Sequence, residues 1–367
     1  MTVRAPAPAA SGVGGDRAAK RARLLEVLDR RGGSALVLRS HTAVAWYLDG
    51  ARTHVSLAGD PVAAVVVRPG GDSVHVFANE ADRMLAEELG DAADLEVVRV
   101  PWHEPLLPPG AEGGALDEAE VAAELRAARA SLLPGELARY RRLCREVAET
   151  LTDAALAASP DDTERAVAAG LAFDLVARGI DPVVVLVAGR GRLAHRHPLP
   201  TGDPLGDRAM LVVCGRRNGL IANATRWVRF GLTDPAEARS MSCILDVEAA
   251  FLDATVPGAT LGEVLAAGTA AYAAHGFDPE EWRRHHQGGA AGYAGRDPRA
   301  VPGIADVVQP GQAFAWNPTA PGAKVEDTVL VGPTGIEVLT VDPRWPSGRV
   351  AGRARPDELE RGRDAPR

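Results

Sequence analysis

The first segment that could do chemistry is a proline-bounded loop carrying two histidines. The run AHRHPLPT places His195 and His197 between two strand-like stretches, and Pro198 and Pro200 are typical of a turn. Such a turn can present an imidazole to a cleft, and a histidine titrates near neutral pH, where it acts as an acid or a base. The histidines without a polar cluster around them are interpreted as structural: His41, His54, His75, His103 and His275.

A second cluster lies in RRHHQGGAAGYAGRD, residues 283–297. Its glycines and alanines suit neither a stable helix nor a core, and so indicate backbone packed closely against a ligand or another strand. The alternative is a flexible glycine loop with solvated basic residues. A functional interpretation is favoured because many side chains here can hydrogen-bond: His285, His286, Gln287, Tyr293, Arg296 and Asp297.

The third segment is FAWNPTAPGAKVEDTVLVGPTGIEVLT, residues 314–340. Asn317 follows an alternating strand and precedes a proline, while Glu326 lies in a strand that is otherwise mostly apolar. A carboxylate is costly to bury unless another group pairs with it. Glu326 therefore faces either solvent or a site.

Two blocks of secondary structure must position these segments, as the length of 367 residues also suggests. In the first block a helix over 17–30 precedes strands at 35–39, 62–68, 74–78 and 95–100, an α/β pattern. In the second, helices beginning at Pro134, Thr163 and Asp234 alternate with a strand at 183–188, a hairpin over 210–231 and three final strands. We expect disordered ends at 1–15 and 346–367, with domains at 16–133 and 134–345.

Composition excludes several classes of protein. The net charge of −8 argues against binding to nucleic acid, which requires concentrated positive charge. No apolar run is long enough for a membrane helix or a secretory signal, so we expect a cytoplasmic protein without a membrane partner. The three cysteines are too few and too scattered for a disulfide framework or a four-ligand zinc site.

Taken in order, these segments resemble the creatinase, aminopeptidase P and methionine aminopeptidase family, peptidase family M24. The resemblance covers nearly the whole chain: AVAWYLDGAR in the first block, then the loop histidine, NATRW after an Asn-Gly turn, the histidine–glycine segment and KVEDTVLVGPTGIEVLT. It implies an α+β protein in which an amino-terminal α/β creatinase-like domain precedes a pita-bread domain. It also implies a homodimer in which Arg52 or His54 reaches the neighbouring subunit's pocket.

The departures from this family concern its metal ligands. Peptidases of the family hold two divalent metals through two Asp, one His and two Glu, because such cations require anionic oxygen ligands. By resemblance, these positions are occupied here by Cys214 (Val212 if the hairpin's missing residues precede it), Asn223, Gly289, Asn317 and Glu326. One of the five family ligands remains. We therefore expect no metal and no other cofactor.

The favoured hypothesis is a creatinase-like hydrolase that cleaves a C–N bond of a small metabolite without a di-metal centre. His197 is the expected general acid or base. It precedes Cys214 by 17 residues, the spacing that the family keeps between its loop histidine and its first Asp. His285 and Glu326 complete the expected catalytic set, with Glu326 binding a cationic group of the substrate. The residues expected to bind substrate are Asn223, Asn317, His286, Tyr293, Arg296 and Trp316.

Two alternatives remain open. The ligand loss is equally expected of a catalytically inactive binding or scaffold protein that keeps the pocket. An ordinary metal-dependent Xaa-Pro aminopeptidase would require a different alignment of the metal positions.

Overall fold

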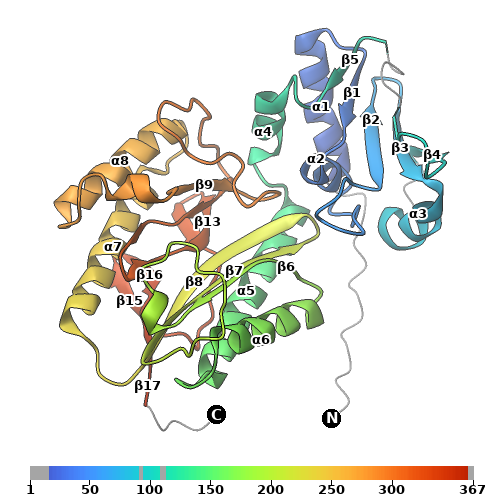
Figure 1. Ribbon diagram of the computed structural model, residues 1–367. Helices are drawn as coiled ribbons and strands as arrows, with labels where there is room; N and C mark the ends of the chain where they lie inside the picture. The colour runs from blue at the N-terminus through green and yellow to red at the C-terminus, as the bar shows by residue number, and fades with distance from the viewer. Residues whose placement is uncertain (1–15, 91–93, 108–112, 363–367) are drawn as a thin grey trace. The chain divides into compact units, whose positions relative to one another are not determined.

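The computed structural model describes residues 16–90, 94–107 and 113–362 (Figure 1). The chain divides into two compact units, the first ending at Arg129 but including Pro134–Glu136, and the second holding Ala130–Leu133 and Leu137–Arg367. This division changes units at Ala130, Pro134 and Leu137, and the expected domain boundary between residues 133 and 134 stays a prediction. The expected disordered segment 1–15 lies outside the described residues.

The first unit is built on one mixed five-stranded sheet of order β4-β3-β2-β1-β5. Helix α1 is the first element of the described chain. The helix ends at Gly32, whose φ of +65° lies in the left-handed region that glycine favours. Its buried stripe of Leu24, Val27 and Leu28 confirms the predicted amphipathic helix. The elements are β1 (Ala35–Leu38), β2 (Ala63–Val67), β3 (Asp72–Phe77), β4 (Leu95–Val100), β5 (Ala115–Asp117), α1 (Arg17–Arg31), α2 (His41–Tyr47), α3 (Ala78–Arg83), the π-helix η1 (Met84–Leu89) and α4 (Ala122–Ala130).

Four long helices enclose the strands of the second unit: α5 (Pro134–Ala157), α6 (Glu164–Ala177), α7 (Pro235–Ala254) and α8 (Leu261–Ala274). In Figure 1 the strands lie between α7 and α8 on one side and α5 and α6 on the other. Two of these helices begin where the sequence predicts, since the side chain of Thr163 accepts from the amide of Ala166 and that of Asp234 from the amide of Ala236. Within the described ranges, no helix is both long and apolar enough to cross a bilayer.

Two four-stranded sheets form the centre of the second unit, ordered β17-β8-β7-β6 and β14-β13-β10-β9. Asn218 and Gly219, at φ +50° and +76°, make the predicted tight turn between β7 and β8. The strands are β6 (Asp181–Ala188), β7 (Arg208–Arg217), β8 (Leu220–Phe230), β9 (Gly288–Ala291), β10 (Ala313–Trp316), β11 (Thr319–Ala320), β12 (Ala323–Lys324), β13 (Asp327–Gly332), β14 (Gly335–Val338), β15 (Ser347–Val350), β16 (Arg353–Pro356) and β17 (Leu359–Arg361); short 3-10 turns are η2 (Arg190–Arg192) and η3 (Glu281–Arg284).

The two sheets meet where β8 passes β13. The amide of Thr225 donates to the carbonyl of Glu326 at 2.9 Å, and the amide of Asn223 donates to the Thr328 hydroxyl at 2.8 Å. These bonds fix the middle of the hairpin against the strand that carries the acidic residues. All three predicted candidates at this junction, Cys214, Asn223 and Glu326, are thereby brought to one region.

The carboxy-terminal segment differs from the expected disordered tail over 346–367. Its residues form β15, β16 and β17, and β17 pairs in parallel with β8. Arg355 is buried and donates to both Glu248 oxygens at 2.5 and 2.6 Å and to Asp327 at 2.8 Å. Residues 363–367 lie outside the described part. The sequence pattern misses this order because an ion pair, rather than a periodic apolar face, holds the segment.

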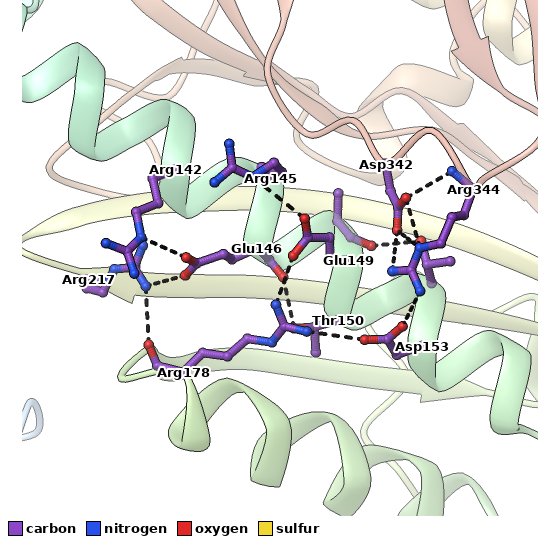
Figure 2. Close-up of polar contacts among 12 residues, drawn as sticks. Arg142, Arg145, Glu146, Glu149, Thr150, Asp153, Arg178, Arg217, Asp342 and Arg344 are labelled. Atoms are coloured by element: carbon purple, nitrogen blue, oxygen red, sulfur yellow. Dashed lines mark hydrogen bonds and ion pairs between the residues drawn. The ribbon is translucent and has the colours of Figure 1, made fainter. Parts of the chain in front are cut away.

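A network of ion pairs runs along one face of α5 (Figure 2). Glu146 pairs with Arg142 on the same helix and with Arg217 at the end of β7. Farther along α5, Glu149 pairs with Arg178, which follows α6. Partly exposed pairs of this kind are each worth about 0.2–1 kcal/mol. The network therefore links α5, α6 and the hairpin at modest energetic gain.

Candidate active site

A pair of histidines from two distant segments forms the centre of the candidate site. The ring nitrogens Nε2 of His197 and His285 are 3.0 Å apart, and the ring centroids 4.7 Å apart. His197 is exposed on the loop after η2, whereas His285 is buried just after η3. One ring must donate and the other accept, so the two neutral rings carry their protons on different nitrogens, Nε2 in one ring and Nδ1 in the other.

The loop that carries His197 is anchored by its neighbour in sequence. The Arg196 guanidinium pairs with the buried carboxylate of Glu281 and donates to the Thr319 hydroxyl at 3.1 Å. On the other side, the Gln287 amide nitrogen donates to the carbonyl of His285 at 2.7 Å. Sequence reasoning missed the roles of Arg196 and Glu281, because their pairing depends on two loops meeting in the fold.

His286 completes a stack of three imidazoles. Its ring lies 4.4 Å from that of His285 and 5.8 Å from that of His197. Burial, followed by the charge of Lys324, lowers the pKa of His285 to about 2, and burial with the charge of Arg296 lowers that of His286 to about 3. Partial burial and Lys324 also lower the pKa of His197. The stack is therefore uncharged near neutral pH.

Glu326 is buried and already paired within the chain. One oxygen accepts from Arg296 at 2.6 Å, and the other from the Thr225 hydroxyl at 3.1 Å with the Lys324 ammonium 3.6 Å away. Burial alone would raise the pKa of Glu326, but Lys324 and Arg296 lower it to about 2. The expectation that Glu326 binds a cationic group of the substrate is therefore wrong, because cations of the protein take that place.

Lys324 is a site residue that sequence reasoning missed. It is buried at the end of β12, three residues before β13 begins at Asp327. A signal was present: only two of the 41 basic residues are lysines, Lys20 and Lys324. Both are buried beside carboxylates, Lys20 within 2.9 Å of Glu136 and 2.5 Å of Asp49 in the first unit. A compact ammonium fits where a guanidinium would not.

The two expected substrate-binding amides are buried with open acceptors. Among the described residues, neither the side-chain oxygen of Asn223 nor that of Asn317 has a hydrogen-bond partner. Cys214 lies directly across the hairpin from Asn223. Burial, followed by the charge of Glu326, raises the pKa of the Cys214 thiol to about 12.

Trp316 does not line the site as expected. Its indole nitrogen donates to the Thr255 hydroxyl at 3.0 Å, and its ring stacks on Phe251 of α7 at 4.9 Å. Side chains alternate across a strand, so Trp316 enters the core while the next residue, Asn317, lies on the other face. Tyr293 is buried beside Gly292, whose carbonyl accepts from the Ile221 amide.

The five residues at the family's metal positions do not fit two divalent metals. Glu326 is engaged by Arg296 and Lys324, and the protonated Cys214 thiol is a poor ligand. Gly289, at φ +143°, has no room for a side chain, since a Cβ there would lie 2.5 Å from the Pro298 oxygen. These positions therefore hold cations and hydrogen-bonding groups instead of a carboxylate cage.

Comparison with known proteins places these features in a family. A model described as metallopeptidase family M24 matches residues 138–333, more than half of the chain. A protein named "Probable dipeptidase PepE" from Mycobacterium tuberculosis (strain ATCC 25618 / H37Rv) is 31% identical over 189 residues, 48% of this chain and 49% of the relative. The chain thus matches about half the length of this curated relative.

Solved structures show that the fold is the pita-bread fold of this group. The crystal structure of dipeptidase PepE from Mycobacterium ulcerans matches with a TM-score of 0.76 and 19% identity, covering 96% of this chain and 99% of the other. The prolidase from Pyrococcus horikoshii OT3 matches with a TM-score of 0.73 and 17% identity, covering 89% and 99%. At these identities the likeness concerns the fold alone.

Proposed function

The chain belongs to metallopeptidase family M24, and from that premise we propose that it hydrolyses a C–N bond of a small metabolite without the family's di-metal centre. The observation that carries the proposal is the contact of 3.0 Å between His197 and His285. Two neutral histidines in contact, one of them exposed, can move a proton at the point where a substrate would enter. Relatives named as dipeptidases and prolidases support hydrolysis of a C–N bond.

In the proposed reaction, His197 serves first as the base and then as the acid. Water attacks the carbon of the C–N bond and gives its proton to Nδ1 of His197, the ring nitrogen that the contact with His285 leaves available, and the same proton passes to the departing nitrogen as the bond breaks. His285 stays neutral because its pKa is about 2, and it orients the His197 ring through their contact. The products contain the elements of one water and nothing else.

The polar groups around the pair select the substrate. The open oxygens of Asn223 and Asn317 accept hydrogen bonds, so they suit N–H groups of a ligand. Lys324 and Arg296 outnumber the one carboxylate of Glu326, so this part of the site carries net positive charge. A small metabolite with N–H donors and an anionic group matches this arrangement.

The test is an assay of EDTA-treated protein against a panel of small amides and amidines. We expect turnover to persist after chelation and His197→Ala to lower kcat by about 10²–10⁴-fold, the usual range for a general acid or base. His195→Ala is the matched control, because His195 is exposed on the same loop. Loss of activity on chelation, or near-stoichiometric metal in active protein, would contradict the proposal.

A second candidate is a non-catalytic binding protein that uses the same site. It is favoured by the unpartnered amide oxygens within the described structure, which suit a ligand whether or not it reacts. Thermal stabilisation by a metabolite panel separates the two candidates. A compound that binds and is never consumed favours the binding protein. The Xaa-Pro aminopeptidase alternative is disfavoured because the residues at the metal positions do not fit its metals.

The expectations of a homodimer and a cytoplasmic location stay predictions. Arg52 pairs with Glu88 at 2.5 Å inside the first unit, and His54 lies edge-on to His41. The oligomeric state is measurable by light scattering of the purified chain. A dimer would support the expectation that the first unit borders a neighbouring pocket.

A further inference from the structure

Three histidines of the second unit bring their ring nitrogens into one small volume. One nitrogen from each of His197, His285 and His286 lies within 4.8 Å of the other two. The closest pair, Nε2 of His197 and Nε2 of His285, is 3.0 Å apart. Two nitrogens bound to the same tetrahedral zinc ion, each at about 2.0–2.1 Å, lie roughly 3.3 Å apart. The closest pair is thus near the spacing that one metal ion requires, and the nitrogen of His286 lies within 4.8 Å of both.

We propose that His197, His285 and His286 bind one borderline divalent cation of the zinc type, and that this cation inhibits the proposed hydrolysis. Imidazole is a favoured ligand of zinc, copper, nickel and cobalt, and three imidazoles leave a fourth position for water. None of the three histidines stands at a position that the family uses for its metals by resemblance. The inhibitory consequence rests on the proposed function, because a cation bound to Nε2 of His197 would draw electron density from the ring and make Nδ1 a poor base.

The surroundings make such an ion exchangeable rather than permanent. The histidines lie near three positive charges, those of Lys324, Arg296 and Arg299. One negative charge, the carboxylate of Glu326, opposes them. In the described structure, Nδ1 of His285 is buried without a hydrogen-bond partner. Ligand histidines in tight sites usually donate that second nitrogen to a fixed acceptor. The site therefore suits a cation that binds and leaves, as an inhibitor does.

Direct binding tests the site without any assay of activity. The full chain is stripped with EDTA and titrated with zinc by calorimetry and with cobalt(II) by visible absorption. We expect one ion per chain, with the absorption of a four-coordinate cobalt site. His286→Ala should weaken zinc binding at least tenfold, whereas His195→Ala, on the exposed part of the same loop, should leave it unchanged. Equal affinity in wild type and His286→Ala would overturn the proposal.

Two further measurements keep the test decisive if His286→Ala fails to fold. Copper(II) bound to the wild-type chain should show nitrogen coupling from several imidazoles in its electron paramagnetic resonance spectrum, and an oxygen-only spectrum would overturn the site. Arg299→Ala should tighten zinc binding severalfold, because it removes an exposed positive charge near His197 and His286. Weaker binding in Arg299→Ala would contradict the electrostatic argument.

The inhibitory role is tested separately from the site. Equimolar zinc should abolish the hydrolysis measured in EDTA-treated protein, and excess chelator should restore it. Activation by zinc would overturn inhibition while leaving the binding site intact. If no substrate of the panel is turned over, the proposed function fails, and the calorimetric and spectroscopic results still decide whether the three histidines bind a cation.

Discussion

Two adjacent acidic residues, Glu326 and Asp327, belong to regions of opposite character. Asp327 accepts from Arg226 and Arg355, each at 2.8 Å, and from the Thr340 hydroxyl at 2.5 Å. Around Glu326, by contrast, buried polar atoms lack partners among the described residues: Oδ1 of Asn223, Oδ1 of Asn317, Nδ1 of His285 and Nδ1 of His286.

The difference separates a satisfied structural network from the candidate site. A buried polar atom without a partner costs about 1–3 kcal/mol, so a chain keeps several together only where a ligand or water can satisfy them. The Asp327 region leaves one such atom, Nη1 of Arg355, in the described structure. We infer that the Asp327 region holds the sheets and the carboxy-terminal segment together, while the Glu326 region is kept open for chemistry.

The largest predicted effect breaks the Asp327 region. Arg355→Ala leaves the buried carboxylate of Glu248 without its guanidinium and leaves Asp327 with Arg226 alone, and should lower the free energy of unfolding by about 3–5 kcal/mol. Denaturation in urea measures this loss. Arg349→Ala, exposed on neighbouring β15, should change stability little. A loss below about 1 kcal/mol for Arg355→Ala, within the range of an exposed pair, would show that the segment is not structural.

The second prediction compares the neighbouring carboxylate. Glu326→Gln keeps the length of the side chain but leaves Lys324 and Arg296 without a counter-charge, and should cost about 2–3 kcal/mol, less than Arg355→Ala. The partly exposed Arg296 can still reach water, which limits the loss. Glu337→Gln, in an exposed pair with Arg141, serves as the control. A greater loss in Glu326→Gln than in Arg355→Ala would reverse the comparison.

The third prediction concerns pH in the Glu326 region of EDTA-treated protein. The pKa of His285 is about 2 in the folded chain, below its ordinary 6.5, so the unfolded chain binds a proton that the folded chain does not. The contribution of His285 to the free energy of unfolding is complete above pH 6.5 and is lost as the pH falls toward 2. At pH 5 the loss should be about 2 kcal/mol.

Urea midpoints at pH 7 and pH 5 measure this effect in the wild type and in His285→Phe. The phenylalanine variant cannot bind a proton at this position, so its stability should fall less between the two pH values. Equal losses in both proteins would place the pH dependence elsewhere in the chain.

The smallest predicted effect comes from the exposed network on α5 (Figure 2). Arg145 pairs with Glu149 at 3.6 Å, and both side chains reach solvent. Arg145→Ala should cost about 0.3–0.5 kcal/mol, as for other pairs one helical turn apart. Thermal melting at low and high salt measures it, with the difference from wild type shrinking as salt rises. A loss above about 1 kcal/mol would exceed the range of exposed ion pairs and would contradict the modest role given to this network.

Local patterns in the sequence predicted much of the fold. The Asn218–Gly219 turn, the Thr163 and Asp234 caps and the stripe of α1 all depend on neighbours within a few positions, and all are present. The carboxy-terminal strands were missed because Arg355 finds its partner Glu248 at a separation of 107 positions. Such pairing leaves no local signal.

The site was predicted less completely than the fold. The loop histidine His197 and His285 were predicted to belong to one site, and the structure brings the two side chains into contact. Trp316 was expected to line the site, but its side chain lies in the core. Residues on both faces of β10 are buried, so the alternation of side chains along the strand does not distinguish the core face from the face toward the site. The role of Lys324 was missed because its ion pair with Glu326 depends on the path that the chain takes from β12 into β13.

The backbone at Gly289 has a consequence for the design of variants. The residue at this point of β9 adopts φ +143° against the backbone of Pro298 and Ala300, so a histidine there would displace the segment 298–300 before it offered a ligand. A single substitution at Gly289 therefore cannot supply the histidine ligand that the family resemblance implies. An engineer who wished to install that ligand would have to rebuild the segment 298–300 as well.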